Sequence, residues 1–71
     1  GLAARYVDIF VAAQLAFDDG VMSRSQFQRY VDSAQAIVEN YPGLHPYLVR
    51  AVGSDDLRSL EVLQPIAVLP E

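Results

Sequence analysis

A chain of 71 residues, of which 52% are hydrophobic and 20% charged, has room for one small domain and is too apolar for the intrinsically disordered class. Its five basic residues are all arginines and stand against nine carboxylates, so the net charge is −4 and we expect no nucleic acid partner. The absence of cysteine excludes a disulfide, and the single histidine cannot form a zinc site by itself.

Residues 2–17 are expected to form the first helix, because they run for about four turns without glycine or proline. Arg5 and Asp8 share one narrow side of this helix, and most other positions are apolar. A helix that is apolar nearly all round is typically buried against several neighbours. We therefore predict contact with a partner protein through five residues: Tyr6, Ile9, Phe10, Ala13 and Phe17. The alternative is the end of a membrane span, although the run is shorter than the roughly 17–25 apolar residues that a bilayer requires.

Gly20 is expected to end the first helix in the left-handed conformation. Asp18 and Asp19 precede it, and their negative charges oppose the helix dipole. Two interpretations of these aspartates follow: an Asx-type turn, or an acidic spot that binds a cation or a basic partner. A degenerate calcium-binding loop is the other interpretation of this segment. With Gly20 at the turn position of such a loop, only Asp19 and Ser23 remain as side-chain oxygen donors, so the calcium interpretation is the weaker one.

The second helix has the clearest start signal in the chain. Ser23 and Gln26 have the spacing of a capping box, and Met22 can pack against Phe27 across it. Apolar residues then recur at spacings of three and four, which predicts one face packed in the core. These residues are Phe27, Tyr30, Val31, Ala34, Ile37, Val38 and Tyr41.

A proline and a glycine at positions 42 and 43 are expected to end the second helix. Residues 44–52 then predict a short third helix, entered through His45 and a following proline. We interpret His45 as a capping or surface group. Ser54 is expected to cap a short fourth helix, with two aspartates in its first turn.

The last eight residues are predicted to form an extended tail, because prolines stand near both ends of the segment. The division is therefore a helical domain of residues 1–63 and a tail of residues 64–71. Ile66, Val68 and Leu69 make the tail apolar, so we predict a second partner contact, by strand addition or by docking in a groove. The alternative is that the tail folds back onto its own helices.

Three stretches carry a resemblance to a known group of proteins: YVDIF at 6–10, FDDGVMSRSQF at 17–27 and YPGLHPYL at 41–48. Together they resemble the soluble helical part of uncharacterised bacterial membrane-anchored proteins, a domain of unknown function. That group has an aromatic helix, a glycine-containing turn, a second helix and a Pro-Gly break before another aromatic helix. The resemblance implies a bacterial origin and membrane association through a segment upstream of Gly1, and it brings no catalytic residues.

The sequence predicts an all-α fold, a bundle of three to four helices with an extended C-terminal tail. The predicted function is a non-catalytic interaction or assembly module without a cofactor, either an accessory subunit of a larger complex or a homo-oligomer. The first alternative is a helical protein that binds a small ligand or calcium. An enzyme comes third, because Asp8, Asp18, Asp19 and Asp32 could serve acid–base catalysis only if folding gathered two of them in a cleft.

Overall fold

The computed structural model describes residues 1–67, which are helical throughout apart from short connections and contain no strand. The all-α prediction is therefore confirmed, with one α-helix more than the three to four expected. The elements are α1 (Leu2–Asp18), α2 (Arg24–Asn40), η1 (Pro42–Leu44), α3 (His45–Ala51), α4 (Ser54–Ser59), η2 (Glu61–Leu63) and α5 (Gln64–Ala67). Within residues 1–67, no helix combines the length and apolar character needed to cross a bilayer.

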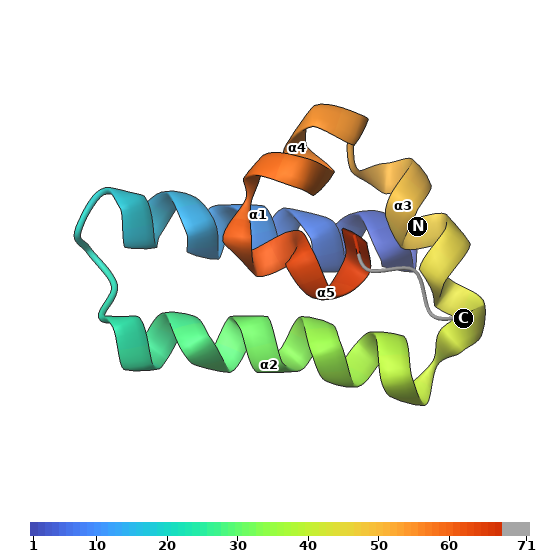
Figure 1. Cartoon of the computed structure of the whole chain (residues 1–71), viewed down its shortest axis with the longest axis horizontal. Helices are drawn as coiled ribbons and strands as arrows, with labels where there is room; N and C mark the ends of the chain where they lie inside the picture. Colours follow the sequence, from blue (N-terminus) through green and yellow to red (C-terminus); the bar gives the residue numbers. More distant parts are fainter. Residues whose placement is uncertain (68–71) are drawn as a thin grey trace.

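Two layers make up the fold (Figure 1). The long helices α1 and α2 run antiparallel as a hairpin, and the short elements that follow lie across one side of it. In this second layer α3 packs on α1, α5 packs on α2, and η2 contacts both long helices. The other side of the hairpin is not covered by these elements, which leaves part of α1 facing outward.

The turn between α1 and α2 is closed by the backbone. Val21 donates its N–H to the Ala16 carbonyl at 2.9 Å and Gly20 donates to the Phe17 carbonyl at 3.0 Å, which is the hydrogen-bond pattern of a Schellman motif. Gly20 has φ +77°, so the predicted left-handed glycine is confirmed. The Asp18 carboxylate accepts a hydrogen bond from the Gln14 side chain rather than from a backbone N–H, and the helix is closed by backbone bonds.

The predicted capping box at the start of α2 is confirmed. The Gln26 N–H donates to the Ser23 hydroxyl at 3.2 Å, and the Ser23 N–H donates to Gln26 Oε1 at 3.1 Å. The start of α4 is shifted by one residue from the prediction. Gly53 is its N-cap and Ser54 its first residue, and no side chain caps it.

The core lies between the two layers. Phe27 of α2 and Leu48 of α3 are fully buried there, together with three residues that follow α4. These three are Val62, Leu63 and Ile66. The C-terminal part of the chain therefore supplies a large share of the apolar interior.

The extended tail predicted from residue 64 onward is wrong for residues 64–67, which form α5. Pro65 lies in the first turn of this helix, where a missing N–H breaks no intrahelical bond. Ile66 points into the core with no exposed surface. The remaining tail residues, Val68 and Leu69 among them, lie outside the described range.

Candidate functional site

Three large apolar side chains of α1 remain more than half exposed. The exposed fractions are 56% for Leu2, 51% for Ile9 and 58% for Leu15. Leu2 and Ile9 are seven residues apart, almost two full turns, so they share one face of the helix. We call this pair the α1 outer face. Leu15 lies on a different flank, beside the start of α4.

Only part of the predicted partner-binding set is available at the surface. Phe10 and Ala13 of α1 are 2% and 3% exposed, and Ile66 is completely buried, so these three are residues of the protein's own core. Tyr6 and Phe17 are half-buried, and Ile9 is exposed. Phe10 and Ala13 are buried for a structural reason. The second layer and α2 cover the side of α1 that carries Phe10 and Ala13.

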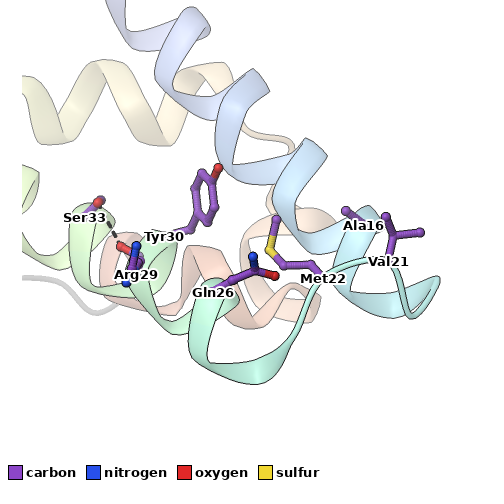
Figure 2. A pocket seen from close by; sticks show the side chains of 7 residues that line it. All are labelled: Ala16, Val21, Met22, Gln26, Arg29, Tyr30 and Ser33. Carbon is purple, nitrogen blue, oxygen red and sulfur yellow. Dashed lines mark hydrogen bonds between the residues drawn. The ribbon is translucent and has the colours of Figure 1, made fainter.

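A surface pocket of about 460 Å³ lies where the α1–α2 turn meets α2 (Figure 2). We call it the turn pocket. Its apolar lining comes from both sides of the turn, and its polar lining comes from α2. The lining residues are Ala16, Val21, Met22, Gln26, Arg29, Tyr30 and Ser33. The Ser33 hydroxyl donates to the Arg29 carbonyl at 2.8 Å, so this hydroxyl is already engaged by its own helix.

A second depression of about 380 Å³ lies between α1 and the chain segment that leaves α3 and enters α4. We call it the α1–α4 groove. Two buried valines, Val7 and Val52, form its deepest part, and the residues around them are half-buried or exposed. These surrounding residues are Asp8, Val11, Ala12, Leu15, Ala51, Gly53 and Asp56.

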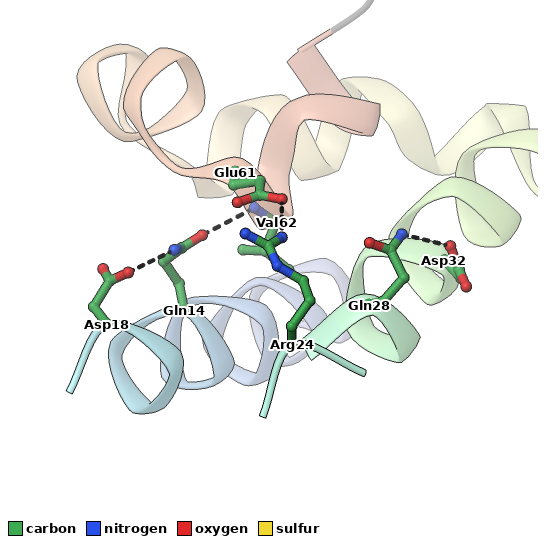
Figure 3. A network of polar contacts seen from close by, with 7 residues as sticks. All are labelled: Gln14, Asp18, Arg24, Gln28, Asp32, Glu61 and Val62. Carbon is green, nitrogen blue, oxygen red and sulfur yellow. Dashed lines mark hydrogen bonds and ion pairs between the residues drawn. The ribbon is translucent and has the colours of Figure 1, made fainter. Parts of the chain in front are cut away.

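Phe17 belongs to an internal stack rather than to a free surface. Its ring lies parallel to that of Phe27, with centroids 4.3 Å apart, and the Arg24 guanidinium lies 4.6 Å from the Phe17 centroid. Arg24 also donates to Glu61 at 2.6 Å, which ties α2 to η2 (Figure 3). The stack thus joins the end of α1, the start of α2 and the second layer.

Two buried polar side chains form hydrogen bonds to the backbone of the second layer. The sequence alone predicts neither of these bonds. Gln14 of α1 accepts the Val62 N–H at 3.0 Å and donates to Asp18 at 3.0 Å (Figure 3). His45, expected at the surface, is instead buried, and its Nε2 lies 2.8 Å from the Ile66 carbonyl. A carbonyl oxygen can only accept, so the imidazole N–H donates.

The carboxylates considered for acid–base chemistry lie at three places: Asp8 in the middle of α1, Asp18 and Asp19 at its C-terminal end, and Asp32 on α2. Asp18 and Asp32 each accept a hydrogen bond from a glutamine on their own helix, and Asp8 lines the α1–α4 groove. Within residues 1–67, no three histidine, aspartate or glutamate side chains gather closely enough to hold a metal ion.

No protein-family model, curated protein or solved structure matches this chain. The resemblance to bacterial membrane-anchored proteins therefore stays a prediction.

Proposed function

We propose that this chain is a non-catalytic helical interaction module, held through the α1 outer face by a second protein chain. The observation that carries the proposal is the pairing of Leu2 and Ile9 on one helix face, both more than half exposed. Tyr6 lies between them in the sequence and is half-buried, so it can extend the same contact. The partner is another copy of this chain or a subunit of a larger complex. Membrane association through a segment upstream of Gly1 belongs to the same proposal.

The energetics of a small core support association. A domain of this size rarely obtains more than about 3–5 kcal/mol from one core, whereas full burial of a leucine or isoleucine side chain is worth about 1.5–3 kcal/mol. About half of each side chain is still exposed, so covering Leu2 and Ile9 would add roughly half of that value for each residue, which is a substantial fraction of the free energy of unfolding. Any partner that binds only the folded state stabilises it in this way.

Self-association is the form of the proposal that can be measured without knowing a partner. Multi-angle light scattering at tens of micromolar protein is expected to give a mass above that of the monomer. Ile9→Gln should restore the monomer. Tyr47→Gln is the matched control, because Tyr47 has a similar exposed fraction of 59% but lies on α3. A monomer for the unaltered chain would contradict self-association. Equal dissociation by both variants would contradict the assignment of the contact to the α1 outer face.

A second candidate function, binding of a small ligand, draws support from the turn pocket. Its volume of about 460 Å³ lies within the range of about 300–1,000 Å³ typical of ligand sites. Met22 and Tyr30 supply apolar lining, and Arg29 supplies one cation. The probe 1-anilinonaphthalene-8-sulfonate combines apolar rings with one anionic group. Its fluorescence should rise with the unaltered protein and fall with Met22→Gln, and no rise would count against the site.

A further inference from the structure

We propose that the α1–α4 groove binds a basic amphipathic helix of the partner. An apolar side chain of that helix would lie over Val11 and Leu15, and a lysine or arginine beside it would pair with Asp8 or Asp56. This inference rests on the proposed function and adds the chemistry of the partner to it.

The shape of the groove favours a helix as its occupant. Asp8, Val11, Ala12 and Leu15 are spaced by three, one and three residues, so they follow one side of α1 for about two turns. A partner helix with apolar residues at the same spacing can lie along such a line. Binding by strand addition would need an unpaired strand edge, and residues 1–67 contain no strand.

The negative charge of the groove favours a partner with positively charged residues at the contact. Among the described residues that line it, Asp8 and Asp56 are the charged ones. Within residues 1–67 the single ion pair joins Arg24 and Glu61, so neither groove carboxylate is paired there. Both carboxylates are exposed, so they are accessible to a cation of the partner. The net charge of −4 would also steer a basic partner toward the protein and repel nucleic acid phosphates.

The apolar part of the groove supplies the other half of the recognition. Leu15 is 58% exposed although it stands directly beside the buried valines of the groove, Val7 and Val52. A side chain placed against Leu15 would therefore extend the existing core outward. A partner helix with an apolar residue and a cation on the same face can make the apolar contact and the charged contact together.

The test uses three fluorescein-labelled amphipathic peptides that differ only in their polar residues. One combines leucine with lysine, the second leucine with glutamine, and the third leucine with glutamate. Fluorescence anisotropy with the full chain is expected to rank binding as lysine, then glutamine, then glutamate. The double variant Asp8→Asn with Asp56→Asn should weaken binding of the lysine peptide by about tenfold. Leu15→Gln should weaken all three peptides.

A matched control separates groove binding from general charge attraction. Asp32→Asn with Glu39→Gln also removes two negative charges, but from α2, and the new amides can still accept the hydrogen bonds of Gln28 and Gln35. The control should leave the lysine peptide within about twofold of the unaltered affinity. Equal weakening by both double variants, no preference for lysine, or no binding at all would overturn the inference.

The same measurements distinguish this inference from the proposed function. If Ile9→Gln abolishes self-association while the lysine peptide shows no dependence on Asp8, Asp56 or Leu15, the proposed function stands and the groove inference falls. If the peptide depends on the groove while the chain is a monomer at every concentration, the groove inference stands and self-association falls. Far-ultraviolet circular dichroism checks that each variant keeps its helices.

Discussion

Gln14 is the side chain that links α1 to the second layer through a buried hydrogen bond. Its amide oxygen accepts the Val62 N–H, and its amide nitrogen donates to Asp18. A buried backbone N–H that loses its acceptor costs its full desolvation penalty, because water cannot replace the missing partner. The amide of Gln14 therefore matters through Val62 more than through Asp18, which is exposed.

Gln14→Met is expected to lower the free energy of unfolding by about 1–3 kcal/mol, since the Val62 N–H is left without an acceptor. Gln28→Met is the matched control. Gln28 also donates to an aspartate four residues later, Asp32, but that pair is exposed (Figure 3). Its loss should change the free energy by less than about 0.5 kcal/mol. Urea unfolding followed by circular dichroism measures both, and equal effects would contradict the role given to Gln14.

Gly20 and Gly43 form a second matched pair, because an added Cβ at either position meets no atom of residues 1–67 within 4 Å. Only Gly20 has positive φ, where an L side chain costs about 1–2 kcal/mol. Gly20→Ala should therefore destabilise the protein by about that amount, while Gly43→Ala should be neutral or stabilising by about 0.4–1 kcal/mol. Thermal unfolding of the two variants measures both changes in stability. Destabilisation by Gly43→Ala equal to that by Gly20→Ala would refute the argument.

At the scale of elements, α5 is held in place by contacts from outside itself. It has four residues, too few for a helix that is stable alone. Ile66 is completely buried between α2 and α3, and the buried His45 donates to its carbonyl. The tertiary contacts thus provide the stability that the short helix cannot provide itself.

His45→Phe keeps a ring of similar size but removes the N–H that reaches the Ile66 carbonyl. We expect a loss of about 1–3 kcal/mol in the free energy of unfolding, because the carbonyl loses the buried donor that His45 supplies. Amide hydrogen exchange of η2 and α5 should accelerate more than that of α2. Tyr47→Phe, on the exposed side of the same helix, should change stability by less than about 0.5 kcal/mol. Uniform acceleration across all helices would instead indicate global destabilisation alone.

Elements with local signals could be predicted from the sequence. Ser23 and Gln26 satisfy each other within one turn, and Gly20 closes a helix by its own φ, so neither needs information from distant residues. The missed features depend on distant contacts. Gln14 and Val62 are 48 residues apart, and His45 and Ile66 are 21 apart. No local pattern reports such pairings.

The same limit applies to the contact surface on α1. Its apolar character could be read from the sequence, but the side covered by the second layer could not. Phe10 and Ala13 were therefore expected at a partner and are found in the core. Leu15 is not among the predicted contact residues and is exposed, while α4 packs on α5 and η2.

At the scale of the whole molecule, the protein combines a small hydrophobic core with large apolar side chains that remain exposed. Within residues 1–67, eleven hydrophobic residues are buried and the Cα radius of gyration is 11.4 Å. Such an interior gives marginal stability, so a contribution from association is expected to be measurable. The α1 outer face and the α1–α4 groove lie on different flanks of α1, and one chain can therefore use both.

The melting temperature is expected to rise with protein concentration, because self-association stabilises only the folded chain and its effect grows by mass action. Scanning calorimetry over about a hundredfold range of concentration should show a steady increase for the unaltered protein. Ile9→Gln should flatten the dependence and lower the melting temperature mainly at the highest concentrations. Tyr47→Gln should keep the slope. A melting temperature independent of concentration for the unaltered chain would refute self-association through the α1 outer face.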